Sequence, residues 1–398
     1  MKKKLFFLAV AAIALASCSN DETIASQTNN EANAISFRPL MTGVTRTANA
    51  AGIKYAFENG DIINVYADYN NSKYFQADFT NNGTTFASAK PYYWPSDVAS
   101  KNVTFTAIWG ATQKENTPGN IDNYSPDAAA ANQKDILVAK HVSSAKESPV
   151  MMNFRHALSQ IFVNVKNTNP NLKVTITGVR IGYVKTASTL FAYSGSGTDT
   201  ATPGTQDAAA TSANIGQSDW TLVDFATPGS GETYANNYKY DQTLTSTELI
   251  GNASDGAHDF AGGFTPWILL PQNMKAFDVD GSSNKLYANA KSGGTGADAP
   301  DLSGSYIALQ MKIENYNGSA ATGTIVSTQW CYWPITTNWT PGYKYTYTID
   351  VASGGYMPTD TDNDKILDPV LDGAVIQFSI SCTIDAWDAE AVNVSGGI

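Results

Sequence analysis

Alternating carboxylates in the last tenth of the chain are the clearest candidate metal ligands in the sequence. Oxygen donors at this spacing suit a hard cation, so the segment predicts a calcium site. The segment departs from the EF-hand loop, because Lys365 stands where that loop needs glycine and Leu371 where it needs the bidentate glutamate. A solvated acidic turn is the alternative interpretation. The four carboxylates are Asp360, Asp362, Asp364 and Asp368.

The cysteine at position 18 has the surroundings of a lipid attachment site. Three lysines precede an apolar run from Leu5 to Leu15, and Ala16-Ser17-Cys18 follows. This order is typical of a secretory signal, and the run is too short to cross a bilayer. The Leu-Ala-Ser-Cys tetrapeptide resembles a bacterial lipobox, which implies that Cys18 becomes the first residue and carries the lipid. An ordinary signal peptide with an incidental cysteine is the alternative.

Cys331 and Cys382 are the only other cysteines. In the oxidising compartment that an export signal implies, they could form a disulfide, which would stabilise the fold by about 4 kcal/mol. Two unpaired cysteines in a core would satisfy the sequence equally well. The pattern does not decide between these alternatives.

The sequence offers little support for catalysis. His141, His156 and His258 are far apart and have no zinc-ligand spacing. The sequence also contains no G-x-S-x-G, P-loop, H-E-x-x-H or G-x-G-x-x-G pattern. We therefore predict a protein that is not an enzyme and that needs no cofactor, calcium aside.

The charge of the chain argues against nucleic acid as a partner. The formal net charge is −11, and no basic cluster follows the lysines near the start. A negative surface repels phosphate backbones.

The elements that would position these residues are β-strands. Runs rich in Tyr, Phe, Trp, Val, Ile and Thr alternate with Gly, Pro, Asn, Asp and Ser, and several runs alternate apolar with polar residues. This pattern predicts an all-β protein built of antiparallel β-sandwiches. The expected strands are 61–67, 103–109, 161–165, 174–183, 306–314, 343–351 and 375–384.

Length and loop content predict two domains in tandem. Residues 194–219 and 291–304 have no hydrophobic pattern and read as long exposed loops in the second half. A boundary near 145–149 separates a shorter domain from a longer one. The predicted parts are a lipoprotein signal peptide (1–17), a leader (18–46), an N-terminal β-sandwich (47–149) and a C-terminal β-sandwich with long loops (150–398).

Several short motifs, taken in order, resemble the fimbrillin family, the type V pilins and pilus-accessory lipoproteins of anaerobic bacteria. The resemblance implies two transthyretin-like domains, export to the outer membrane, and a place in a cell-surface pilus with other pilus subunits as partners. The motifs that carry it, beside the lipobox, are Ile35-Ser36-Phe37, Thr45-Arg46-Thr47-Ala48, the stretch 154–161, the stretch 339–345 and the stretch 376–387.

The resemblance also implies maturation by cleavage after an arginine, and the sequence favours Arg46, giving Thr47 as the new first residue. Arg38 precedes a proline, and Arg155 and Arg180 lie in or beside predicted strands. Ile35, Ser36 and Phe37 would then belong to a strand that fills an open groove until cleavage displaces it. An incidental arginine in a leader is the alternative.

In this family, subunits polymerise by donating a strand to a neighbour. Here the C-terminal region alternates apolar and polar residues and is the candidate donor, whereas an ordinary final strand of its own domain is the alternative. The apolar positions of the candidate donor are Ile376, Phe378, Ile380, Cys382 and Ile384.

A surface lipoprotein that binds glycans without polymerising is the alternative function. Tryptophan rings can form sugar-binding platforms, although β-sandwich cores also need aromatic side chains. The candidate rings are Trp220, Trp267, Trp330, Trp333 and Trp339.

Overall fold

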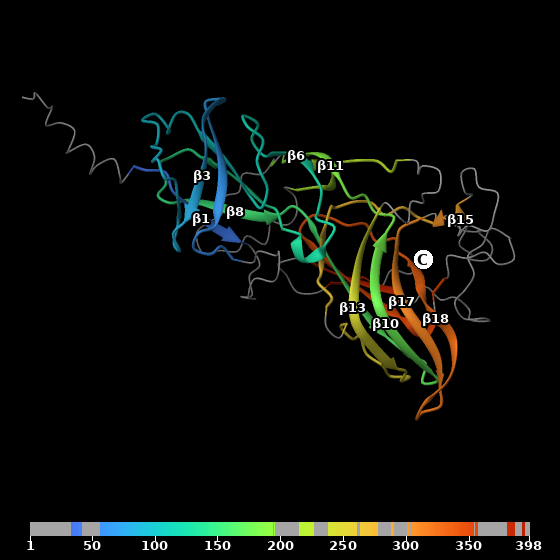
Figure 1. Ribbon diagram of the computed structural model, residues 1–398. Coiled ribbons are helices and arrows are strands. Elements are labelled where there is room, and N and C mark those ends of the chain that lie inside the picture. Colours follow the sequence, from blue (N-terminus) through green and yellow to red (C-terminus); the bar gives the residue numbers. More distant parts are fainter. Residues whose placement is uncertain are drawn as a thin grey trace, which may run out of the picture.

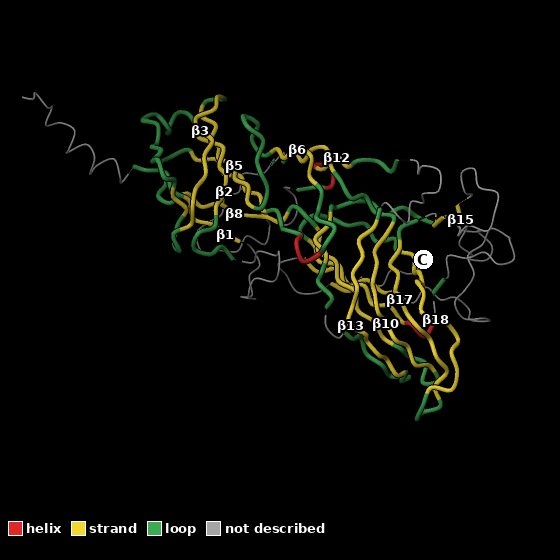
Figure 2. The backbone as a smooth tube through the Cα atoms, in the orientation of Figure 1, coloured by secondary structure: helices red, strands yellow, loops and turns green. Residues whose placement is uncertain are grey.

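The fold is all-β, as predicted (Figures 1 and 2). Within the described residues, the regular structure is β-strand apart from three short 3-10 helices: η1 (Ala130–Asn132), η2 (Gln217–Asp219) and η3 (Val351–Ser353). None of the described helices is long and apolar enough to cross a membrane. The computed structural model describes residues 33–41, 56–193, 195, 215–226, 238–260, 263–277, 288–289, 301–302, 304–353, 355–356, 380–386 and 392–394.

The N-terminal strands close into a barrel with the strand order β1-β4-β3-β2-β5-β7-β8. Alternate side chains point inward because successive residues of a strand face opposite sides. Ile63, Val65 and Ala67 of β2 are buried in this way, in a core that includes Phe105 and Phe154. The barrel strands are β1 (Phe37–Met41), β2 (Ile62–Tyr69), β3 (Ser72–Asn81), β4 (Phe86–Ala87), β5 (Val103–Trp109), β7 (Leu137–Ser143) and β8 (Val150–His156).

Strand pairing extends this domain at both ends relative to the sequence prediction. β1 lies in the segment predicted as leader, yet it pairs with β8 and β4 and so joins the two edges of the sheet. β8 lies beyond the predicted boundary at 149, yet it pairs with β7 and β1. Residues 144–149 thus connect two strands of one barrel, and the change to the next sheet follows His156.

The C-terminal domain is a β-sandwich of two sheets, with the orders β13-β10-β17-β18 and β14-β9-β19-β20-β21. A single core cluster draws on both, including Ile176 and Leu309 from the first sheet and Val163 and Tyr345 from the second. The sandwich strands are β9 (Ser159–Lys166), β10 (Leu172–Gly182), β13 (Lys239–Ile250), β14 (Trp267–Leu269), β17 (Tyr306–Tyr316), β18 (Ala321–Pro334), β19 (Tyr343–Asp350), β20 (Ile380–Ala386) and β21 (Val392–Val394). A separate pair consists of β15 (Ala288–Asn289) and β16 (Asp301–Leu302).

A third sheet, which we call the bridging sheet, connects the two domains. It consists of β6 (Asn120–Tyr124) from the N-terminal domain with β11 (Ser188–Ala192) and β12 (Trp220–Leu222) from the C-terminal domain. Figure 1 shows β6 and β11 between the barrel and the sandwich. A buried cluster beside this sheet includes Ile121 and Ile136 from one domain and Phe191 and Leu270 from the other. Backbone pairing and apolar packing therefore both join the domains.

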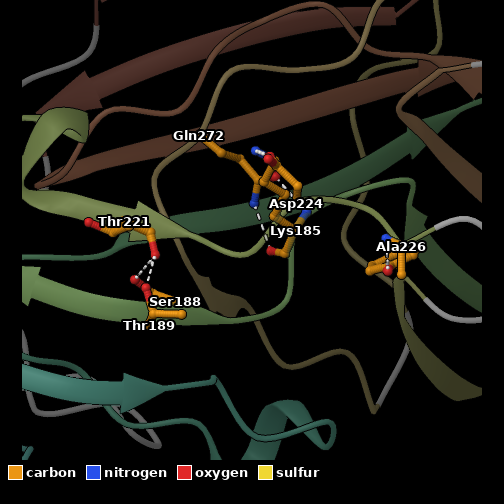
Figure 3. A network of polar contacts seen from close by, with 8 residues as sticks. Lys185, Ser188, Thr189, Thr221, Asp224, Ala226 and Gln272 are labelled. Atoms are coloured by element: carbon orange, nitrogen blue, oxygen red, sulfur yellow. Dashed lines mark hydrogen bonds and ion pairs between the residues drawn. The ribbon is translucent and has the colours of Figure 1, made fainter.

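Polar contacts fix the chain that leads into the bridging sheet (Figure 3). Lys185 N donates to Gln272 Oε1 at 2.6 Å, and Gln272 Nε2 donates back to Lys185 O at 3.1 Å. The ammonium group of Lys185 lies 2.7 Å from Asp224 Oδ1. Ser188 Oγ donates to Thr221 O at 2.8 Å, which ties β11 to β12.

Candidate functional site

The candidate site is the place of β1 in the barrel, which we call the leader groove. It is formed by β8 on one side and by β4 with residues 92–94 on the other. β1 runs parallel to β8, with Phe37 opposite Val150 and Met41 opposite Phe154. Val150 N donates to Ser36 O at 2.8 Å. The leader therefore completes the barrel through main-chain pairing.

The opposite wall of the groove holds the leader at fewer points. Pairing with β4 is confined to Phe37 opposite Phe86. Just upstream, Ile35 N donates to Tyr92 O at 2.7 Å, and Ala34 forms an isolated bridge with Tyr93. On this side, the pairing of the described leader ends at Phe37.

Two leader side chains anchor the strand in the apolar interior. Ile35 is 2% exposed and Phe37 is 0% exposed. The Phe37 ring meets Phe79 edge to face at 4.8 Å between centroids and Phe105 at 5.1 Å. Arg38 is exposed, so the leader has one buried and one outward face. Of the three residues predicted as a strand, Phe37 begins β1 and Ile35 and Ser36 lie just before it, in a groove lined by aromatic side chains.

The predicted lipidation and processing residues lie outside the described residues. This applies to Cys18, Arg46 and Thr47. The described chain stops at Met41 and resumes at Ala56, so Arg46 falls between β1 and the rest of the barrel. A cut after Arg46 would separate β1 from every other barrel strand in the sequence.

The candidate donor region is described only in part. Ile376 and Phe378 lie outside the described residues. Ile380, Cys382 and Ile384 belong to β20, which pairs with β19 along its whole length and with β21 over three residue pairs. These three residues therefore sit in an ordinary strand of their own domain.

The two sandwich cysteines are thiols, so the disulfide that we considered is not formed. Cys331 lies on β18 and Cys382 on β20, in the two different sheets, and both contribute to the sandwich core. Burial raises the pKa of the Cys331 thiol to about 12. This thiol behaves as a small apolar side chain.

The predicted calcium ligands Asp360, Asp362, Asp364 and Asp368 lie outside the described residues. Among the described residues, no group of three or more His, Cys, Asp or Glu side chains has the arrangement of a metal site. Calcium binding by the acidic segment stays a prediction.

Comparison with known proteins identifies the family. The sequence profile of the family described as fimbrillin-like matches residues 45–387, which is most of the chain. The chain belongs to the fimbrillin-like family. The match begins beside Arg46 and leaves β1 outside it.

Solved structures similar to this fimbrillin-like chain include a fimbrial protein from Bacteroides vulgatus. It shares 14% identity with a TM-score of 0.47, and the match covers 88% of this chain and 99% of that one. A candidate cell adhesion protein from Bacteroides uniformis shares 14% identity with a TM-score of 0.43, covering 89% and 98%. A search of proteins with curated descriptions found no match.

A buried histidine–aspartate contact that the sequence did not reveal lies where the barrel of this fimbrillin-like chain meets the sandwich. His156 Nδ1, at the end of β8, lies 2.6 Å from Asp135 Oδ2, and both side chains are almost fully buried. The next backbone amide, Ala157 N, donates to Ile136 O. Asp135 stands alone between Lys134 and Ile136, so no local pattern marked it. These two contacts join the end of β8 to the residues just before β7, which indicates a structural role.

The tryptophans proposed as a sugar platform are mostly core residues. Trp220, Trp267, Trp333 and Trp339 are buried. Only Trp330 among the five is partly exposed, and the guanidinium group of Arg180 lies 4.2 Å from its ring centroid. The glycan-binding alternative therefore loses the exposed rings on which it depended.

Proposed function

We propose that this fimbrillin-like chain is a structural or adhesive subunit of a cell-surface pilus, made as a precursor whose leader strand holds the assembly groove closed. The observation that carries the proposal is β1 itself. It completes the barrel, buries Phe37 fully, and precedes Arg46 in the chain.

Cleavage after Arg46 would turn β1 from part of the chain into a bound peptide. Of the four arginines, Arg155 and Arg180 are 8% and 9% exposed, and Arg38 is followed by Pro39. Proteases need an accessible target, so the buried Arg155 and Arg180 are unfavourable and Arg46 is left as the candidate. Loss of β1 would expose unpaired backbone groups along β8 and an apolar opening beside Phe79 and Phe105.

A strand from another subunit would refill this opening. Main-chain hydrogen bonds would supply much of the affinity, and the pockets vacated by Ile35 and Phe37 would supply specificity. The partners are therefore other pilus subunits. We further propose that the precursor is exported as a lipoprotein and held at the outer membrane by lipid on Cys18 until it is processed. We assign it no catalytic role.

The experiment is to treat the purified precursor with an arginine-specific protease, then to sequence the new N-terminus and run unboiled samples on a denaturing gel. We expect a start at Thr47 and a ladder of polymers. Arg46→Ala should remove both, whereas Arg38→Ala should remove neither. A single band of monomer after complete cleavage would refute assembly by strand donation.

A further inference from the structure

The end of the barrel that lies away from the sandwich, which we call the distal end, is where the leader enters the fold. β1 and β8 both start there and run in parallel toward the sandwich (Figure 1). Strand pairing places Tyr69, Val103 and Ser143 at the same end, because Val103 pairs with both of the others. The distal end therefore consists of the start of the leader together with residues 69–74, 88–102 and 144–149.

Exposed tyrosine side chains gather at the distal end. In the part of the chain that the structure describes, Tyr74 and Tyr93 are the exposed tyrosines, at 40% and 36%. The Tyr74 hydroxyl donates to Tyr93 O at 2.6 Å, so the two residues are in contact. Tyrosine has an apolar ring and a polar hydroxyl, and it is enriched where proteins meet the boundary between membrane and water. This pair is therefore suited to a lipid surface.

The distal end is also more basic than the chain as a whole. Its three segments carry four lysines against two carboxylates, whereas the whole chain has a formal net charge of −11. Both carboxylates are engaged by neighbouring side chains, Asp97 by Lys101 and Glu147 by His141. The remaining lysines therefore give this end a positive surface.

The lysines best placed to attract an anionic surface are Lys90 and Lys146. Both are exposed, and neither has a carboxylate partner among the described residues. Lys73 contributes less, because it lies opposite Asp68 on the neighbouring strand. A membrane that contains anionic lipid attracts lysines near its surface and repels the acidic remainder of the chain. Charge would therefore turn the distal end toward the membrane.

We propose that the distal end is a membrane-docking surface, at which Tyr74, Tyr93 and the two lysines rest on anionic lipid headgroups while the precursor is anchored. This inference rests on the proposed function, because it requires the lipid on Cys18. Fifteen residues, 18–32, separate that lipid from the described part of the leader. A chain of this length spans at most about 50 Å. The tether therefore reaches the fold at the distal end and keeps that end near the membrane.

The tether also makes a weak docking contact sufficient. A lipid-anchored protein meets the membrane at a high effective concentration, so docking has to compete only with the freedom of the tethered domain. The leader contributes to the surface directly, since Lys146 Nζ donates to Asn33 Oδ1 at 3.4 Å and Ala34 forms a bridge with Tyr93. Release of the leader after cleavage would therefore remove the tether and these two contacts together.

The test uses the lipidated precursor reconstituted in vesicles and measures which end of the protein faces the lipid. A fluorescent dye is attached through Ala99→Cys at the distal end or through Ala253→Cys at the far end of the sandwich, and energy transfer is measured to an acceptor on the lipid headgroups. Both alanines are exposed, and the thiols of Cys331 and Cys382 are buried. On phosphatidylcholine vesicles that contain phosphatidylglycerol, we expect much stronger transfer from the dye at the distal end.

Charge variants separate docking from tethering. Lys90→Gln with Lys146→Gln should lower the ratio of docked to undocked protein by about tenfold or more, because each lysine near an anionic surface contributes roughly a factor of five. Lys134→Gln with Lys275→Gln removes the same charge from exposed positions away from the distal end and should leave the ratio unchanged. Vesicles of phosphatidylcholine alone, or high salt, should reduce docking of the unsubstituted protein as the first pair of substitutions does.

The outcomes separate this inference from the proposed function. Equal transfer from the two dye positions, or full docking by the protein with Lys90→Gln and Lys146→Gln, would overturn the inference and leave lipidation and pilus assembly intact. A precursor whose intact mass shows no lipid on Cys18 would overturn the lipoprotein part of the proposed function and this inference with it.

Discussion

The stability of the leader strand should depend strongly on Phe37, the larger of its two buried anchors. Phe37→Ala in the uncleaved precursor removes a fully buried ring together with its edge-to-face contacts with Phe79 and Phe105. Truncating a buried phenylalanine costs about 3–5 kcal/mol. Because β1 lies at the seam of the barrel and pairs with β4 at a single residue, we expect most of this cost to appear as easier opening of β1 alone.

The measurement is hydrogen exchange of the Val150 amide, which donates to Ser36 O and becomes exposed when β1 leaves. A loss of about 4 kcal/mol corresponds to exchange faster by roughly several hundredfold, since about 1.4 kcal/mol is a factor of ten. Arg38→Ala, on the outward face of the same strand, should leave the exchange rate nearly unchanged. Unchanged exchange at Val150 in Phe37→Ala would mean that Phe37 does not hold the leader in place.

Two other predictions concern electrostatics. Asp135→Ala leaves His156 buried without its carboxylate, and we expect a loss of about 3–5 kcal/mol in the free energy of unfolding, measured in urea. A loss below about 1 kcal/mol would show that the pair contributes little. The second prediction concerns Asp241, which accepts two hydrogen bonds from Arg180. Burial by itself raises the pKa of Asp241, but the contacts with Arg180 and Lys239 outweigh it and hold that pKa below its ordinary value. The pair should therefore stabilise the fold above about pH 4 and lose this effect as the pH falls through the lowered pKa. Asp241→Asn should destabilise the protein at neutral pH and differ less from the unsubstituted protein near pH 3. An equal difference at both values would contradict this.

Strands in which apolar and polar residues alternate were predictable from the sequence. Residues 103–109 were predicted as a strand and form β5 with the same bounds. Residues 306–314 form most of β17. In β5, for example, Val103, Phe105 and Ala107 enter the barrel core, while Ile108 on the other face packs into a second cluster, so strand geometry places alternate residues on opposite faces.

Strands that depend on distant partners could not be predicted in the same way. β6, with the sequence Asn-Ile-Asp-Asn-Tyr, has only one fully buried side chain, Ile121, and its strand conformation comes with its pairing to β11. The pairing of β1 with β8 joins segments that are far apart in the chain, and no local sequence pattern predicts it. The boundary at 149 was misplaced for the same reason, because a turn inside a barrel and a linker between domains have similar composition.

The candidate site was predictable where side chains alternate. The apolar–polar–apolar order of residues 35–37 indicates that Ile35 and Phe37 lie on the same face, and both side chains are buried in the structure. The cysteine pair was not decidable, because alternation indicates the face of a strand but not which residue of the other sheet lies across the core. Cys331 and Cys382 share a core as thiols on different sheets.

The bridging sheet has a mechanical consequence for a protein placed in a filament. The chain passes from barrel to sandwich at residues 156–158, and a pull transmitted only there would load a single peptide segment. Pairing of β6 with β11 provides a second path in parallel with the first. Several backbone hydrogen bonds then share the tension between barrel and sandwich. Under load the two domains should therefore stay together, and the filament should break first at another place.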